Sequence, residues 1–309
     1  MLTLRSMTPA DFDELAELIF LSTNSWYRQH LGYAVLAGQP EDCRIFCDVY
    51  QAIDPGRGLV VEHSATGRIV GSCFCHERET HTSLGIMNVH PSYFGRGVAG
   101  MLLREIIRIG EARGLPIRLV SSAMNLDSYS LYNRFGFVPV AVFQDMLVTV
   151  PNEGFHPSAP EAVMPTVRPA DPGDVDAIAE LEQRVAGISR TGDYQYLIAN
   201  EAGIWHTVVA LDERDQVSGF LASIDSAALK LIGPGVAVDA AAAEAMLRAQ
   251  LQRFLGSDVL VVLPASYPEL IAVAYGLGAR NCELHFAQVR GRAAPINGVV
   301  FPTYLPETA

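Results

Sequence analysis

The sequence lacks the features that mark membrane, secreted or nucleic-acid-binding proteins. No apolar run reaches the length of a membrane-spanning helix, and the N-terminal stretch lacks the positive region and apolar core of a signal peptide. The 22 basic residues form no block and are outnumbered by 34 acidic ones. A net charge of -12 disfavours binding to nucleic acid or to an anionic membrane. These absences predict a cytoplasmic protein with neither kind of partner.

Cysteine is scarce, with five residues in a chain of 309. An odd count in a long chain argues against a disulfide framework. Neither Cys43 with Cys47 nor Cys73 with Cys75 has the C-x-x-C spacing of common zinc knuckles. We therefore expect buried free thiols in a reducing compartment, and no metal site.

Apolar residues, in contrast, make up half of the chain, and its length suggests about two domains. The expected elements occur twice in the same order: a strand, a helix with a Pro/Asp start, a hairpin, a strand–helix unit and a closing strand. Thr166 to Asp171 echoes Thr3 to Asp11 at the start of the two copies. The predicted division is a domain at 1–150, a Pro-rich linker at 151–165, a second domain at 166–292 and an unassigned tail at 293–309.

A glycine-rich turn follows the strand expected at 83–89 and opens the helix expected at 97–112. Gly95, Gly97 and Gly100 let the backbone turn tightly and approach a ligand. The N–H groups and dipole of the helix start favour an anion, and a diphosphate fits this chemistry. A tight turn without a ligand is the alternative.

Two known glycine-rich fingerprints compete for this turn. A Walker loop needs Gly-Lys followed by Ser or Thr, and this stretch contains no lysine. The glycines do satisfy G-x-G-x-x-G, but they follow hairpin-like strands rather than opening a parallel sheet, which disfavours NAD. A nucleotide-dependent redox enzyme is therefore the less favoured interpretation of this turn.

Two motifs resemble those of the GNAT acyltransferase superfamily. Val89-His90-Pro91 followed by Phe94 to Ala99 is similar to its pyrophosphate motif Q/R-x-x-G-x-G/A, with Phe94 in place of Gln or Arg. The second motif, N-x-x-A-x-x-L-Y-x-x-x-G-F, is met by Asn125, Ser128 in place of Ala, Leu131, Tyr132, Gly136 and Phe137. The resemblance implies an α/β (α+β) fold of two tandem GNAT-like domains, each with a mixed, mostly antiparallel sheet flanked by helices. Residues 166–292 share the layout only.

The resemblance also implies a role for each matched residue. Acetyl-CoA would be the co-substrate, and a small-molecule amine or a peptide would accept the acyl group by direct transfer. Tyr132 would protonate the leaving thiolate, although an ordinary aromatic at a sheet edge is the other reading. The implied coenzyme contacts are the pantetheine-pairing strand Met87, Asn88 and Val89, the pyrophosphate cradle Phe94, Gly95, Arg96, Gly97, Val98, Ala99 and Gly100, and the arm contacts Asn125 and Ser128.

The general base is not evident, because the strand at 83–89 carries no carboxylate. His81 at its start is our candidate, since histidine titrates near neutral pH; a solvated loop residue is the alternative. Glu77, Glu79 and His76 are further candidates. The apolar face of the first helix is expected to end near Ile19. Four aromatic residues follow in the expected segment after the helix: Trp26, Tyr27, His30 and Tyr33. They would suit an apolar or cationic acceptor, or equally a packed lid.

The second copy lacks the glycine turn at the corresponding place. Asp239 and Glu244 put negative charge where a diphosphate would lie. We therefore expect one coenzyme site per chain, in the N-terminal domain, and a degenerate second domain. The missing base leaves a non-catalytic acyl-CoA sensor or scaffold as the alternative function. Monomer and homodimer are both compatible with the sequence.

Overall fold

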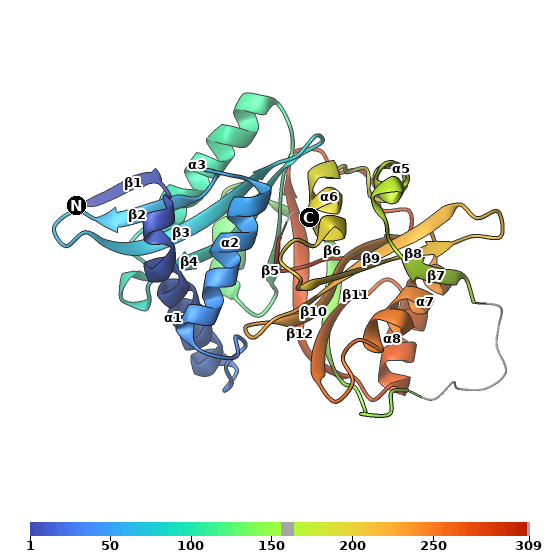
Figure 1. Ribbon diagram of the computed structural model, residues 1–309. Coiled ribbons are helices and arrows are strands. Elements are labelled where there is room, and N and C mark those ends of the chain that lie inside the picture. The colour runs from blue at the N-terminus through green and yellow to red at the C-terminus, as the bar shows by residue number, and fades with distance from the viewer. Residues whose placement is uncertain (156–163, 308–309) are drawn as a thin grey trace. The chain divides into compact units, whose positions relative to one another are not determined.

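The computed structural model describes residues 1–155 and 164–307 of the chain (Figure 1). Most of the expected linker, 156–163, and the last two residues of the tail lie outside the described residues. The chain forms two compact units. Unit 1 contains residues 1–119, 227–229 and 304–307, and unit 2 contains 120–155, 164–226 and 230–303.

Unit 1 is a sheet covered by helices on both faces. Its strands pair in the order β1-β2-β3-β4-β5, all antiparallel except β4 with β5. Figure 1 shows α1 and α2 in front of these strands and α3 behind them. The elements are β1 (Leu2–Ser6), α1 (Phe12–His30), α2 (Arg44–Ile53), β2 (Leu59–His63), β3 (Arg68–Glu77), β4 (Thr82–Val89), α3 (Val98–Arg113) and β5 (Ile117–Ser122), with short 3-10 turns at Pro9–Asp11, Pro40–Cys43 and Pro91–Tyr93.

Helix α1 is longer than its apolar pattern predicts. It continues to His30, so the expectation that Trp26, Tyr27 and His30 follow the helix is wrong. The reason is that buried polar residues extend the inner face beyond Ile19. Asn24, 1% exposed, accepts hydrogen bonds from two backbone N–H groups of the following loop and donates one to a carbonyl there. Hydrophobic periodicity does not detect a face of this kind.

The start of α3 is fixed against β3 by a close backbone approach at Gly71. A Cβ at this position would lie 2.4 Å from Cγ1 of Val98, the first residue of α3. Glycine is therefore required where the first turn of α3 crosses the strand. This contact positions the glycine turn that precedes the helix.

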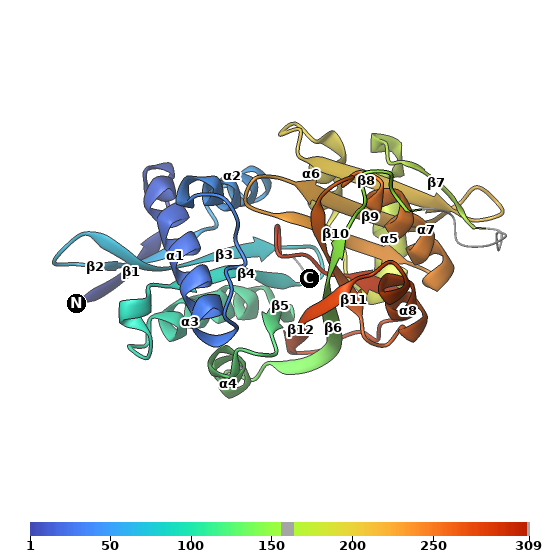
Figure 2. The ribbon, with the colours of Figure 1, turned by 90° about the horizontal axis from the view of Figure 1, so that it is seen from below.

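Unit 2 contains the end of β5 and a sheet in the order β12-β6-β11-β10-β9-β8-β7, with β13 beside β10. In Figures 1 and 2, α5 and α6 lie on one side of the β8–β10 strands, and α7 and α8 on the other. The elements are α4 (Leu126–Arg134), β6 (Val138–Thr149), β7 (Thr166–Pro169), a 3-10 turn at Pro172–Asp174, α5 (Val175–Ala186), α6 (Thr191–Ala199), β8 (Trp205–Leu211), β9 (Val217–Asp225), β10 (Lys230–Ala237), α7 (Ala240–Leu251), β11 (Asp258–Pro264), α8 (Pro268–Gly276), β12 (Arg280–Arg290) and β13 (Val299–Phe301).

The two sequence copies share an ion pair at equivalent places. Arg5 binds Asp11 through two hydrogen bonds of 2.8 Å, and Arg168 binds Asp174 through bonds of 2.8 and 2.7 Å. Each pair joins the first strand of its copy to the helix start. The match also corrects the expected echo, because Asp174, rather than Asp171, takes the place of Asp11, and Asp171 opens the turn in the place of Thr8.

The compact units do not end where the sequence copies end. Strand β6 closes the first copy, yet it lies in unit 2, between β12 and β11 of the second copy. The tail, unassigned from the sequence, contributes β13 to unit 2 and residues 304–307 to unit 1. The predicted domain ranges, which follow the copies, stay a prediction.

Within the described residues, none of the helices combines the length and the apolar character needed to cross a bilayer. Cys43, Cys47, Cys73 and Cys75 are buried free thiols, as expected, whereas Cys282 is exposed. Burial raises the pKa of the Cys75 thiol to about 12, and that of Cys43 and Cys47 equally. These three thiols are therefore poor nucleophiles at neutral pH.

Candidate active site

The predicted phosphate turn joins β4 to α3 in unit 1. Gly95 and Gly97 adopt φ angles of +73° and +83°, in the left-handed region that glycine tolerates best. Gly97 occupies the N-cap position of α3 and, having no side chain, cannot cap the helix itself. The first turn of α3 contains no acidic residue. The helix start therefore keeps backbone donors and a positive dipole end that suit an anion.

The space around Gly95 and Gly97 is open, whereas Gly100 is buried. A Cβ at Gly95 or Gly97 would meet no atom within 4 Å, and one at Gly100 would meet only the Arg104 guanidinium, at 3.5 Å. Packing within the chain does not demand glycine at 100, unlike at Gly71. The exposed side chains of Arg96 and Arg104 add positive charge on this part of unit 1.

The corresponding helix start in the second copy is closed by its own side chain. Asp239 caps α7, its Oδ1 accepting a hydrogen bond of 2.9 Å from the N–H of Ala242. The glycines of β10 serve packing instead. A Cβ at Gly233 would lie 2.3 Å from the Pro302 carbonyl oxygen, and one at Gly235 would lie 2.5 Å from the Leu221 side chain.

Strand β4 provides the backbone segment that the resemblance assigns to pantetheine. The side-chain amide nitrogen of Asn88 donates to Ser22 Oγ of α1 at 2.8 Å and to Thr23 Oγ1 at 3.1 Å, and the buried side-chain oxygen has no partner among the described residues. The register of β3 with β4 shifts between Cys73 and Cys75, which marks a bulge. Within this stretch the N–H of Ile86 donates to the Tyr50 hydroxyl rather than to β3.

Helix α4, in unit 2, carries the second motif. Asn125 is its N-cap, and the side-chain oxygen of Asn125 accepts a 3.0 Å hydrogen bond from the N–H of Ser128. Tyr132 is buried, and its ring packs edge-on against Phe137 with centroids 6.0 Å apart. On the same helix, Tyr129 contacts Phe286 of β12, with centroids 5.7 Å apart. The cap explains locally why the motif requires Asn at 125.

The candidate base His81 is buried rather than solvated. Its side chain is 0% exposed, its Nδ1 lies 3.1 Å from Thr80 Oγ1, and its carbonyl accepts from the N–H of Arg78 and from Arg113. The alternative reading as a solvated loop residue is therefore wrong. Glu77 forms ion pairs with two arginines, at 2.7 and 3.5 Å. A role for His81 as the base stays a prediction.

His76 belongs to a second buried network of unit 1. It contacts Asp54, which also accepts two hydrogen bonds of 2.8 Å from Arg78. Burial opposes ionisation of Asp54, but the bonds from His76 and Arg78 outweigh it and lower the pKa of Asp54 to about 2. Asp54 is thus a permanently charged link between α2 and β3 at neutral pH.

The expected acceptor residues form an aromatic group at the end of α1. The rings of Trp26 and His30 stack with centroids 4.6 Å apart, and Tyr27 and Tyr33 lie 6.0 Å apart. His30 Nδ1 is 2.9 Å from the carbonyl of Trp26. The group is half-buried or exposed, which fits either a binding surface or a lid. Its role in acceptor binding stays a prediction.

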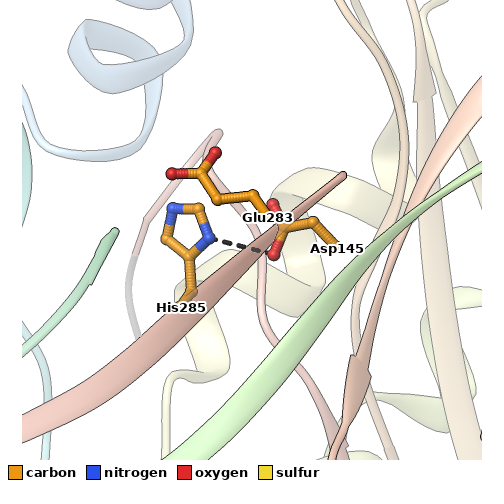
Figure 3. A group of neighbouring side chains, drawn as sticks. All are labelled: Asp145, Glu283 and His285. Atoms are coloured by element: carbon orange, nitrogen blue, oxygen red, sulfur yellow. Dashed lines mark hydrogen bonds and ion pairs between the residues drawn. The ribbon is translucent and has the colours of Figure 1, made fainter. Parts of the chain in front are cut away.

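Sequence reasoning missed a buried polar cluster in unit 2. Asp145 on β6 and Glu283 and His285 on β12 bring their side-chain polar atoms within 4.8 Å of one another (Figure 3). Ser122, at the end of β5, donates a hydrogen bond to Glu283. We call these four residues the Asp145 cluster. They lie far apart in the sequence, and the pairing of β12 with β6 that joins them has no sequence signal.

Comparison with known proteins places both halves of the chain in one superfamily. Residues 16–137 match the family described as Acetyltransferase (GNAT) family, and residues 178–295 match the Acetyltransferase (GNAT) domain. The comparison with curated proteins gave no match.

Solved structures show the same fold over nearly the whole chain. An acetyltransferase candidate from Pyrococcus horikoshii has a TM-score of 0.74 and 16% identity, with 99% of this chain and 95% of that chain covered. A tandem GNAT protein from the clavulanic acid biosynthesis pathway has a TM-score of 0.60 and 14% identity, covering 95% and 100%. The myristoyl-CoA-bound N-myristoyltransferase of Saccharomyces cerevisiae has a TM-score of 0.61 and 11% identity, with 99% of this chain and 85% of that chain covered.

The two matched regions and the shared architecture define a protein built from two acetyltransferase-type domains. The chain belongs to the GNAT superfamily, with two GNAT domains in tandem. The predictions of family and fold class are thereby confirmed. Membership supports an acyl-CoA-dependent acyltransferase, without specifying the acceptor or the active domain.

Proposed function

We propose that this protein transfers an acyl group, with acetyl as the expected one, from coenzyme A to an amine by direct attack, and that the N-terminal GNAT domain holds the coenzyme. The observation that carries this proposal is the difference between two equivalent helix starts. Helix α3 begins with an uncapped glycine and open space, whereas α7 is capped by the Asp239 carboxylate. Only the first can accept a diphosphate without losing a hydrogen bond or placing two anions together.

The thioester end of the coenzyme is assigned to α4. The side-chain oxygen of Asn125 is used by the helix cap, which leaves its N–H donors for a pantetheine carbonyl. Tyr132 lies two turns further along the same helix, and its hydroxyl is the proposed donor to the departing thiolate. A proton supplied at the sulfur lowers the barrier to breaking the C–S bond, because a neutral thiol is a better leaving group than a thiolate.

Thermal unfolding with coenzymes tests the binding part of the proposal. A ligand that binds only the folded state raises the melting temperature. Acetyl-CoA should raise it, whereas NADH at the same concentration should not. The reverse result would reject acyl-CoA binding and favour a redox enzyme.

Thiol release tests the catalytic part. Purified protein with acetyl-CoA and a panel of amines and peptide N-termini should release free coenzyme A thiol above the no-acceptor background. Acetyl-CoA binding without turnover across a broad panel would support the sensor alternative. The acyl group is tested in the same assay by replacing acetyl-CoA with longer acyl-CoAs.

A further inference from the structure

The Asp145 cluster is held together by the pairing of β6 with β12. Glu283 lies directly opposite Asp145 in the antiparallel register, and His285 follows two positions along β12, so the three side chains share one face of the sheet. A register shift between Asn281 and Glu283 marks a bulge at the start of the group. Bulges are common next to active sites, where they redirect a side chain.

Hydrogen bonds orient each member of the cluster. His285 Nδ1 lies 2.9 Å from Asp145 Oδ1, which makes Nδ1 a donor, so in the neutral ring Nε2 is the acceptor. Figure 3 shows the Glu283 carboxylate beyond the ring from Asp145, on the side of the other nitrogen. The Ser122 hydroxyl donates to Glu283 and accepts from the N–H of Met124 at 3.1 Å.

Ser122 is the part of the cluster that a substrate can reach. It is half-buried, whereas Asp145, Glu283 and His285 are 2%, 5% and 6% exposed. A serine hydroxyl has one proton and two lone pairs, so Ser122 can still accept one more hydrogen bond. It ends β5 and precedes the Asn125 cap of α4 by three residues. The exposed end of the cluster therefore lies close to the start of α4, the helix that carries Tyr132 and is capped by Asn125.

We propose that Ser122, Glu283 and His285 form a proton relay that deprotonates the acceptor amine, with Asp145 as a positioning residue. This inference rests on the proposed function, and it supplies the base that β4 lacks. It also indicates the acceptor class: an amine that arrives as an ammonium ion, attracted by two buried carboxylates. The acidic excess of the chain agrees with a cationic acceptor.

The proton balance of the reaction is complete with these groups. The ammonium gives one proton to Ser122 Oγ as Ser122 passes its own to Glu283, and the neutral nitrogen then attacks the thioester carbonyl carbon. The C–S bond breaks, the thiolate takes the Tyr132 proton, and the acylated nitrogen gives up a second proton, which restores Tyr132. The products are an amide, coenzyme A thiol and one proton, which leaves the relay to solvent.

The hydrogen bond between Asp145 and His285 favours a relay over a metal site. Because Nδ1 donates to Asp145, a metal could bind only Nε2, on the side of the ring away from that carboxylate. Two protein ligands would remain, Glu283 and His285, whereas zinc sites use three or four.

The test compares Ser122→Ala, Glu283→Gln and His285→Gln with the wild type by thiol release across pH 6–10, and measures acetyl-CoA binding by calorimetry. General-base catalysis contributes roughly 100-fold or more, so kcat at neutral pH should fall by that factor. The loss should shrink as the pH approaches the pKa of the amine, because the free amine then needs no base. Asp145→Asn should change the pH profile of kcat and lower kcat by a smaller factor than the other three variants. Acetyl-CoA affinity should stay unchanged.

Asp258→Asn is the matched control. Asp258 accepts a 2.6 Å hydrogen bond from Thr149, so it forms a hydroxyl–carboxylate pair between β6 and β11, outside the cluster. Its variant should keep the wild-type rate and pH profile. If Glu283→Gln fails to fold, Ser122→Ala, at a half-buried position, still decides the matter.

The outcomes separate the relay from the proposed function. Failure of the wild type to bind acetyl-CoA rejects both, and binding without any turnover rejects catalysis and with it the relay. Turnover with wild-type kcat and pH profile in Ser122→Ala and Glu283→Gln rejects the relay alone. Loss of activity after dialysis against EDTA, restored by zinc, would also overturn it.

Discussion

A substitution at Gly100 is expected to change acetyl-CoA binding without lowering stability. An alanine there fits the structure, because its Cβ would meet only the flexible Arg104 side chain at 3.5 Å. Alanine is also the better helix former by about 1 kcal/mol. We expect Gly100→Ala to keep or raise the melting temperature, and to weaken acetyl-CoA binding roughly 10-fold or more because the methyl group occupies ligand space.

Gly276→Ala provides the control for this comparison. Gly276 ends α8, and a Cβ there would meet nothing within 4 Å. Both variants should be at least as stable as the wild type, but only Gly100→Ala should lose affinity in calorimetry. Equal affinities would show that the α3 backbone does not approach the ligand.

Tyr132 is expected to act in the chemical step rather than in binding. The hydroxyl is the proposed proton donor to the thiolate, and the ring packs against Phe137. Tyr132→Phe keeps that packing and removes only the hydroxyl, so it should lower kcat by roughly 100-fold with little change in the Kd of acetyl-CoA. Rapid-mixing thiol release measures the rate. A variant with unchanged kcat would remove Tyr132 from the mechanism.

Single residues differ in how far the sequence reveals them. The Gly95 and Gly97 conformations could be predicted, since few other residues tolerate positive φ at a strand–helix turn. The Asn125 cap is local and follows from residue type. The Asp145–His285 contact could not be predicted, because it spans 140 positions and depends on which strand lies beside β6.

At the level of elements, the starts of α3 and α7 should respond to mirrored substitutions. Gly97→Asp places a carboxylate at the N-cap of α3, in a left-handed conformation that Asp tolerates better than most residues. We expect it to abolish acetyl-CoA binding by repulsion of the diphosphate while the fold persists. Asp239→Ala should cost about 1 kcal/mol of unfolding free energy through loss of the α7 cap, with no change in acetyl-CoA affinity.

Urea denaturation and calorimetry on the two variants test this contrast. The expected pattern is a crossed one, in which the first variant loses binding and the second loses stability. Loss of acetyl-CoA binding in Asp239→Ala would instead assign the coenzyme site to the second copy.

The link between α2 and β3 should make stability depend on acid pH. The pKa of Asp54 is lowered from 3.8 to about 2 in the folded state, so its stabilisation is complete above pH 4 and is lost as the pH falls toward 2. The shift corresponds to roughly 2 kcal/mol. Urea titrations between pH 5 and pH 2.5 should therefore show a steeper loss of unfolding free energy for the wild type than for Asp54→Asn. Parallel curves would show that Asp54 is not held in its charged form.

Elements with a clear period or end signal could be predicted, and those stabilised by tertiary contacts could not. Short apolar runs between turn residues predict strands over 117–122 and 205–211, and β5 and β8 have these bounds. The sequence does not predict helix α6, because this segment shows little amphipathic character. The last turns of α1 were missed because Asn24 is buried through hydrogen bonds rather than through apolar surface.

For the whole molecule, the number of copies is visible in the sequence but the composition of the units is not. The repeated Arg–Asp pair and element order reflect local interactions within each copy. The placement of β12 between β5 and β6 does not follow from local interactions, because strand pairing is decided by contacts between residues distant in sequence. This placement brings Glu283 and His285 of the second copy to Ser122 and Asp145 of the first. In this way the second copy can supply residues of the proposed relay.

The stoichiometry of acetyl-CoA binding tests this division of labour in the intact chain. One helix start is open and the other is capped by Asp239, so calorimetry should give one acetyl-CoA per chain of 309 residues, in monomers and in homodimers alike. Gly97→Asp should then remove all binding. Two sites in the wild type, or a residual site in Gly97→Asp, would show that the second domain binds the coenzyme despite its carboxylate cap. A value of one half would mean that two chains share a site. A value of one, lost in Gly97→Asp and kept in Asp239→Ala, assigns the coenzyme to the first domain and leaves the second with the acceptor side of the reaction.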